Sequence, residues 1–225
     1  DKIKTIAYSL VRNAIRIQIS PKDPVAKNIT HAVAFVEMDD KRFFLENILK
    51  EYEENRFVVF VRTKVRAERV MAAMERVEIK TEFLHGGVDQ KERLSILNRF
   101  RDGETRILIT TDVAARGIDI EELAYVINYD IPNIPETYVH RIGRTGRAGN
   151  GGISISFCSK DEEPYWKDIQ KLIKVDVQTI TDHPYPWHSG SPAAIANKPN
   201  NSNRSGGAHK SRKSNASKQN KKRWY

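Results

Sequence analysis

Residues 138–149 read YVHRIGRTGRAG and combine the side-chain types best suited to binding an anion. Arginines recur at every third position, at Arg141, Arg144 and Arg147, and glycines stand among them. A guanidinium presents a planar fork that matches phosphate oxygens, and glycine lets the backbone approach a ligand closely. The segment therefore predicts a phosphate site, and a solvated basic loop is the alternative interpretation.

The elements that position this segment follow an alternating pattern. Apolar, β-branched runs predict strands over residues 31–38, 57–62, 81–85, 106–111, 125–129 and 152–157. Helical spacing between them predicts helices over 39–52, over 65–77 with Val70, Met74 and Val77 in one stripe, and over 89–101 with Leu94, Leu97 and Phe100. This alternation predicts an α/β fold with a doubly wound, mainly parallel sheet flanked by helices.

Polar residues and glycines come where the predicted strands end. Thr63 follows the second strand, Gly86 the third, and Thr111 with Asp112 the fourth. Because ligands of such folds bind at the carboxyl ends of the strands, we expect these residues to meet on one rim of the sheet.

The charge of the chain is concentrated at its end. The sequence has 38 Lys and Arg against 29 Asp and Glu, and nine of the basic residues follow Asp182, after which there is no acidic residue. A basic tail predicts a polyanionic partner, which composition alone leaves open between RNA, DNA and an anionic membrane. The one cysteine, Cys158, excludes an internal disulfide and a cysteine-rich metal site, and with no long apolar run or signal-peptide pattern the expected location is the cytoplasm.

We expect three segments along the chain. Residues 1–25 have helical spacing that Pro21 and Pro24 end, and are interpreted as the end of a preceding domain and a linker, or alternatively as a helix of the same domain. Residues 26–183 form the α/β domain. Residues 184–225 are rich in Ser, Asn, Lys, Gly and Pro and predict a disordered, basic, low-complexity tail.

Residues 26–180 resemble the C-terminal RecA-like domain of a DEAD-box RNA helicase. Five ordered segments are similar to that family's motifs: VFVRTK at 59–64, HGGVDQKER at 85–93, TTDVAARGID at 110–119, NYDIP at 128–132 and HRIGRTGR at 140–147. The basic tail resembles that of the bacterial RhlE-type subgroup.

The resemblance implies a nucleotide site made of residues from the last two long motifs. It makes Arg147 the arginine finger and Arg144 its neighbour on the γ-phosphate of ATP, both catalytic and both cofactor-binding. We expect the two to lie one helical turn apart and to point at one target. The resemblance also places Asp119 on the ribose hydroxyls, with Gly117 beside it.

The resemblance assigns further residues to RNA and to contacts between domains. Arg116, His140 and Arg141 would join an interdomain network, although His140 has a purely structural role as its alternative. The residues expected on RNA phosphates, without reading of bases, are Thr63, Gly86, Arg93 and Thr111. For Thr63, an ordinary helix cap is the alternative.

The sequence contains neither Gly-x-x-x-x-Gly-Lys-Ser/Thr nor Asp-Glu-Ala-Asp. ATP with Mg²⁺ is therefore expected to be held mainly by an N-terminal RecA-like domain, which would be a partner of this one, and this chain alone is expected to be inactive and to bind no metal. The predicted function is the C-terminal half of an ATP-dependent RNA helicase, with RNA and not a membrane as partner. A stand-alone RNA-binding or docking module and a DNA helicase are the alternatives.

Overall fold

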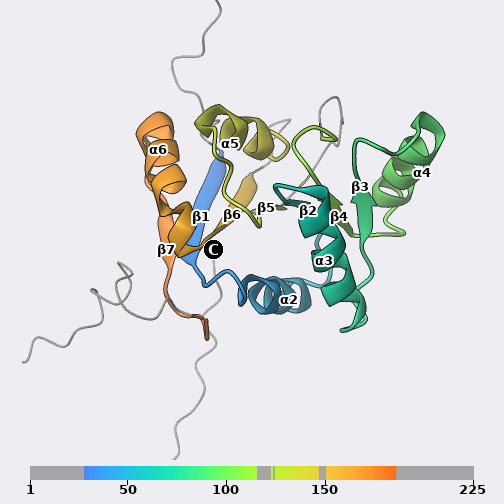
Figure 1. Cartoon of the computed structure of the whole chain (residues 1–225), viewed down its shortest axis with the longest axis horizontal. Helices are drawn as coiled ribbons and strands as arrows, with labels where there is room; N and C mark the ends of the chain where they lie inside the picture. The colour runs from blue at the N-terminus through green and yellow to red at the C-terminus, as the bar shows by residue number, and fades with distance from the viewer. Residues whose placement is uncertain (1–27, 116–122, 124, 147–150, 186–225) are drawn as a thin grey trace, which may run out of the picture.

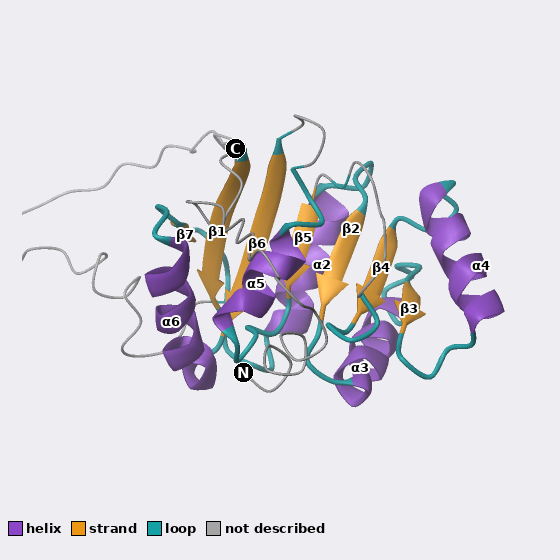
Figure 2. Ribbon diagram, turned by 90° about the horizontal axis from the view of Figure 1, so that it is seen from above, coloured by secondary structure: helices purple, strands orange, loops and turns teal. Residues whose placement is uncertain are grey.

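The central element of the fold is one parallel β-sheet (Figures 1 and 2). The computed structural model describes residues 28–115, 123, 125–146 and 151–185. Within these residues the strand order is β3-β4-β2-β5-β6-β1-β7, every pair is parallel, and Figure 2 shows the arrows pointing the same way. The strands are β1 (Ile29–Phe35), β2 (Phe57–Phe60), β3 (Glu82–Leu84), β4 (Ile107–Thr110), β5 (Tyr125–Asn128), β6 (Gly152–Cys158) and β7 (Gln178–Ile180).

Helices cover both faces of the sheet. Helices α2 (Lys41–Glu51) and α3 (Lys64–Glu75) lie on one face, and α4 (Gln90–Arg101), α5 (Pro135–Ile142) and α6 (Glu163–Ile173), which follows the short helix η1 (Lys160–Glu162), lie on the other (Figure 1). Successive side chains of a strand point to opposite faces, so Val59 packs under α2 and α3 while Val58 packs under α4. The predicted doubly wound α/β fold is confirmed.

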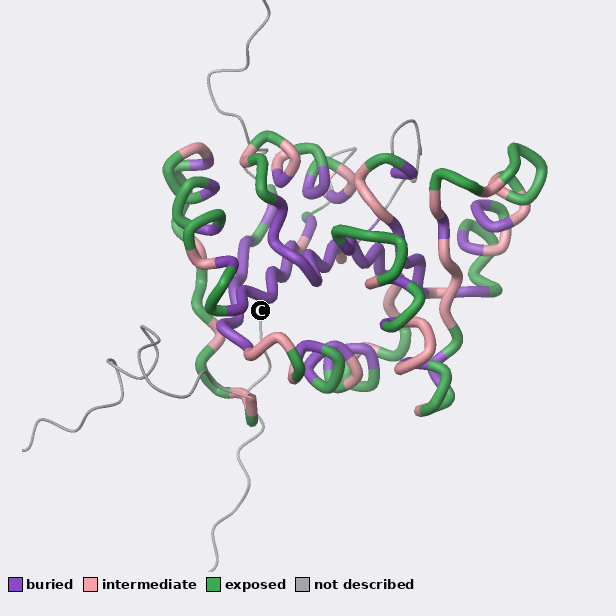
Figure 3. The backbone as a smooth tube through the Cα atoms, viewed as in Figure 1, coloured by how far each residue is buried: buried purple, intermediate pink, exposed green. Residues whose placement is uncertain are grey.

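The apolar runs of the sequence form the buried centre. All four residues of β2 and of β4 are buried, and Figure 3 shows the buried strands between helices whose outer surfaces are exposed. Burying a large apolar side chain contributes about 1.5–3 kcal/mol, which explains why strands covered on both faces are apolar at every position.

The predicted elements occur with shifted boundaries. The six predicted strands are present, and the three predicted helices correspond to α2, α3 and α4. Leu94, predicted to be on the apolar stripe of α4, is instead 50% exposed, and the buried residues of that helix are Ile96, Leu97 and Phe100. Ile96 and Phe100 are four residues apart and therefore share the face of α4 toward the sheet, and Leu94 lies to one side of that face.

Four elements of the described residues were not predicted: α5, η1, α6 and β7. Helix α5 begins with Pro135, which suits a first helical position, and ends at Ile142. Arg144 therefore lies beyond the helix, and Gly146 follows with a positive φ of 69°. Arg147 lies outside the described residues, so the expected spacing of Arg144 and Arg147 by one helical turn stays a prediction, although Arg144 itself is not part of the helix.

Candidate functional site

The first hollow of the candidate site lies where β2, β3 and β4 end. Thr63, Gly86 and Thr111, three of the four residues predicted to contact RNA, line one hollow of about 310 Å³. Its other lining residues are Arg62, Lys64, His85, Gly87, Asp112 and Val113. The parallel strands bring these residues together because their carboxyl ends meet at one edge of the sheet.

Local hydrogen bonds fix the backbone of this hollow. Thr63 caps α3, and its hydroxyl accepts a hydrogen bond of 3.1 Å from the amide of Arg66, so the capping role given as the alternative is present. The imidazole of His85 accepts a hydrogen bond of 3.0 Å from the amide of Gly87. Gly86 is exposed, and a Cβ there would meet only Val113, at 3.9 Å.

Arg93 lies beside this hollow without lining it. It is in the first turn of α4, which Asp89 caps by accepting a 2.9 Å hydrogen bond from the amide of Glu92. The guanidinium of Arg93 donates to the carbonyl of Ala114 at 2.9 Å. Arg93 therefore holds the turn that follows Thr111 as well as adding positive charge near the rim.

A second hollow, of about 330 Å³, adjoins the first. It is lined by Phe60, Asp112, Ala115, Thr137, His140, Arg141 and Arg144, so Asp112 belongs to both hollows. His140 is exposed at the last turn of α5, and Arg144 is half-buried just after it. His140 and Arg144 of the arginine-rich segment and the residues at the strand ends thus line neighbouring parts of one surface.

Arg141 is a buried residue of this domain. Its side chain is 1% exposed, and its guanidinium donates to both carboxylate oxygens of Asp112, at 2.6 and 2.9 Å. It also donates to the carbonyl of Asp130 at 2.6 Å. The prediction that Arg141 contacts another domain is therefore corrected, because its donors are used inside this one. With Arg141 and Asp112 neutralising each other, Arg144 supplies positive charge to the second hollow.

Four predicted site residues lie outside the described residues: Arg116, Gly117, Asp119 and Arg147. Their roles stay predictions. The predicted segment 1–25 and all of the predicted tail 184–225 except residues 184 and 185 also lie outside the described residues.

The sequence analysis missed a buried charged cluster behind the site. Lys41 and Glu162 form an ion pair in which neither side chain is more than 2% exposed. Glu162 also accepts hydrogen bonds from Arg62 and from the amide of Ile131, each at 3.1 Å. Asp130 accepts a 2.9 Å bond from the amide of Arg62. The cluster links the residues after β2 and β5 to α2 and η1, and so stabilises the edge of the sheet where these strands end.

Ionisable groups beneath α5 are kept neutral by burial. Burial raises the pKa of Tyr138 to about 12 and lowers the pKa of His31, whose ring nitrogen Nδ1 lies 2.9 Å from the Tyr138 hydroxyl. Burial also raises the pKa of Cys158, so its thiol stays protonated at neutral pH.

The described residues contain no group of three or more His, Cys, Asp or Glu side chains that could hold a metal ion. Among the same residues, none of the helices has the length and apolar character needed to cross a membrane.

Comparisons with known proteins agree with this geometry. Residues 40–149 match the helicase conserved C-terminal domain. The ATP-dependent RNA helicase RhlB of Shewanella amazonensis is 36% identical over 192 residues, which are 82% of this chain and 44% of the relative. The ATP-dependent RNA helicase DbpA of Bacillus subtilis is 38% identical over 178 residues, 79% of this chain and 37% of the relative. The chain thus spans less than half the length of these two curated relatives.

Solved structures give the same result. In the complex of the Escherichia coli DEAD-box protein SrmB with the regulator of ribonuclease activity A, the matching chain is 31% identical and superposes with a TM-score of 0.69, over 74% of this chain and 99% of that one. Saccharomyces cerevisiae Dbp5 bound to RNA and ADP BeF3 is 30% identical with a TM-score of 0.71, over 80% of this chain and 48% of that one. The predicted RhlE-type subgroup is not confirmed by these relatives. The chain belongs to the DEAD-box RNA helicase family and contains its helicase conserved C-terminal domain.

Proposed function

We propose that this chain is the C-terminal half of an ATP-dependent RNA helicase, which supplies an arginine finger and RNA-backbone contacts for RNA-stimulated ATP hydrolysis and local duplex unwinding. One observation carries the proposal: two hollows meet at Asp112, one with Arg144 and the other with Thr63, Gly86 and Thr111. A nucleotide and an RNA strand bound there would be neighbours on the surface that an N-terminal domain closes.

The second hollow fits the outer phosphates of a nucleotide. Arg144 and His140 line it, and Arg144 supplies its positive charge. The charge of the buried Arg141 is neutralised by Asp112. ATP with Mg²⁺, held mainly by an N-terminal RecA-like domain, would supply the phosphoryl group. Arg144 would bind its oxygens, Arg147 would stabilise the charge that develops there, and Asp119 with Gly117 would hold the ribose.

The first hollow fits a nucleic-acid backbone. It combines the exposed backbone at Gly86 and Gly87 with the hydroxyls of Thr63 and Thr111, and these groups bind phosphates without reading bases. The structure of the relative Dbp5 bound to RNA supports this assignment by similarity. Arg93 would add charge, and Arg116 with His140 would contact the N-terminal domain.

The nucleotide site is tested by RNA-stimulated ATPase assays of the full-length helicase with both domains. We expect Arg147→Ala to lower turnover by about 10³-fold or more, while RNA affinity at fixed salt changes by less than about twofold. Arg76→Ala, which removes an exposed arginine at the far end of α3, is the matched control and should retain turnover. Full turnover in Arg147→Ala would refute the finger assignment.

The RNA site is tested by placing a carboxylate in the first hollow. Gly86→Glu has room at Cβ, so the domain should fold, and we expect RNA affinity to fall by about tenfold or more because the new charge repels phosphates. Gln170→Glu, at an exposed position of α6, adds the same charge elsewhere and is the control. Equal RNA binding by both variants would contradict the site.

RNA binding without any ATPase activity in the wild-type protein would favour the stand-alone module. ATPase stimulation by DNA equal to that by RNA would favour a DNA helicase.

A further inference from the structure

A third hollow, of about 420 Å³, lies between α2 and α3 and shares no residue with the two at the rim. It is on the sheet face opposite α5 and α6 (Figure 1). Four arginines line it: Arg42 from α2, Arg66 and Arg69 from α3, and Arg76, which caps the end of α3. We call this hollow the arginine groove. The proposed helicase function does not use it.

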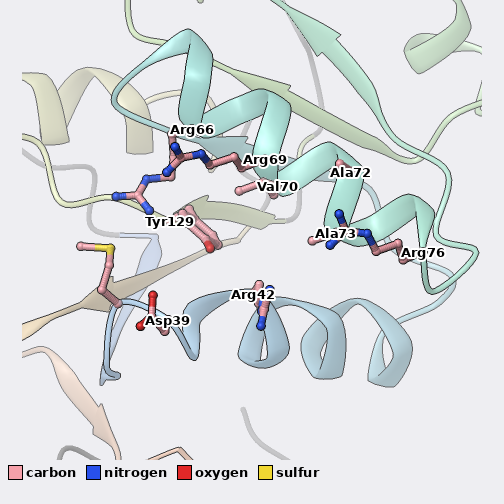
Figure 4. A pocket seen from close by; sticks show the side chains of 10 residues that line it. Asp39, Arg42, Arg66, Arg69, Val70, Ala72, Ala73, Arg76 and Tyr129 are labelled. Atoms are coloured by element: carbon pink, nitrogen blue, oxygen red, sulfur yellow. The ribbon is translucent and has the colours of Figure 1, made fainter.

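The positions of the arginines follow from helix geometry. Arg66, Arg69 and the cap residue Arg76 are separated by three and seven positions, so they lie along one side of α3, and Arg42 of the neighbouring helix α2 also lines the groove (Figure 4). Arg66 lies 3.7 Å from the carboxylate of Asp130. Within the described part of the chain, Arg69 and Arg76 form no ion pair and are exposed. Asp39 is the one acidic lining residue, so the groove carries net positive charge.

The floor of the groove is apolar. Val70, Ala72 and Ala73 lie between the arginines, and the two alanines leave the space that makes the groove (Figure 4). Tyr129 lies at the base but is only 4% exposed, so its ring is not free to stack on a base. None of the described residues that line the groove is Ser, Thr, Asn, Gln or Lys. Arginines contact RNA phosphates as well as carboxylates, but contacts to an RNA backbone are also made by small hydroxyls and free backbone amides. The described lining residues supply no such hydroxyl, and the amides in the middle of α3 are used by the helix.

An acidic peptide fits this combination better than RNA does. Guanidiniums form paired hydrogen bonds with carboxylates, and an apolar floor accepts an apolar side chain. Arg69 and Arg76 are about 10 Å apart along the helix axis, and an extended peptide advances about 3.3 Å per residue. Two carboxylates about three residues apart, with an apolar side chain between them, would match the two ends of the groove and its floor.

We propose that the arginine groove is a docking site for an extended acidic segment of a partner protein, in which an apolar residue separates the carboxylates. Charge complementarity selects the acidic residues, and the alanine floor selects the apolar one. The site is independent of nucleotide and RNA binding at the rim.

Fluorescence anisotropy tests the proposal with the full chain and a short fluorescein-labelled synthetic peptide, in which glutamates flank one leucine. We expect the wild-type chain to bind the peptide, and the variant Arg69→Glu/Arg76→Glu to bind it about tenfold more weakly or worse. Lys167→Glu/Lys171→Glu reverses two exposed charges on α6 and should change the affinity by less than about twofold. Since both variants keep the basic tail, binding of the peptide to that tail would survive in both.

Three results would overturn the proposal. The first is no peptide binding by the wild-type chain. The second is equal binding by the wild-type chain and by the groove variant. The third is an equal loss of affinity for a single-stranded RNA and for the peptide when the wild-type chain is replaced by the groove variant, since the groove would then be a nucleic-acid surface. Circular dichroism of both variants checks that the exposed substitutions leave the fold intact.

Discussion

Replacing Glu162 by glutamine should destabilise the domain more than replacing its partner Lys41 by methionine. Both side chains are almost fully buried, at 2% and 0% exposed, so neither charge is solvated once its partner is removed. Removing one member of a buried ion pair costs about 3–5 kcal/mol, because the remaining charge is left without compensation.

The hydrogen bonds that survive each substitution decide which variant is less stable. Without the Lys41 ammonium, the Glu162 carboxylate still accepts from Arg62 and the Ile131 amide at 3.1 Å, and from the amide and hydroxyl of Ser159 at 3.1 and 2.9 Å. Without the Glu162 carboxylate, Lys41 keeps the Tyr129 carbonyl at 2.8 Å and the carboxylate of Asp130 at 4.0 Å.

We therefore expect Lys41→Met to cost about 3 kcal/mol, near the lower end of the range for a broken buried pair, and Glu162→Gln about 5 kcal/mol. The double variant should lose less than the sum of these two costs, by about 2 kcal/mol or more, because it removes both charges together. Urea unfolding at 25 °C, followed by circular dichroism, measures all four proteins of this double-mutant cycle.

Two outcomes would refute the reasoning. Additive costs, within about 0.5 kcal/mol, would mean that the two charges are not coupled. A larger cost for Lys41→Met than for Glu162→Gln would mean that the surviving hydrogen bonds do not compensate the carboxylate.

Three further predictions concern pH, packing and the tail. Burial lowers the pKa of His31 below 6.5, so below about pH 6.5 the unfolded chain takes up a proton that the folded chain does not. The free energy of unfolding should therefore fall by up to about 1.4 kcal/mol per pH unit as the pH drops. Urea titrations of His31→Gln should show a weaker dependence of this free energy on pH, and a dependence equal to that of the wild type would contradict the argument. Gly152→Ala should cost about 1–3 kcal/mol, since the new Cβ would lie 2.7 Å from the Gly146 amide nitrogen and against the Thr145 side chain; wild-type urea stability would disprove the clash. Deleting residues 184–225 should weaken RNA binding and flatten its salt dependence, and RNA affinities that match the intact chain at every salt concentration would exclude a role for the tail.

The sequence was sufficient to predict the fold and the place of the rim. The runs 58–61 and 107–109 are apolar at every position, which is the pattern of strands covered on both faces, and both are buried in the parallel sheet. Once the strands are parallel, the residues after them must share one edge, so Thr63, Gly86 and Thr111 were expected to meet and do line one hollow. These features depend on local periodicity and chain order, which the sequence contains.

The tertiary structure decided which charges face a ligand and which hold the domain together. Arg141 and Arg144 belong to the same motif, yet Arg141 is buried against Asp112, 29 residues away, while Arg144 lines the second hollow beyond the end of α5. Lys41 pairs with Glu162 across 121 residues, and no local pattern distinguishes either from an exposed charge. The periodicity of a sequence predicts which side of its own helix or strand a side chain occupies. The partner of a buried charge depends instead on which other elements the fold places next to that side chain.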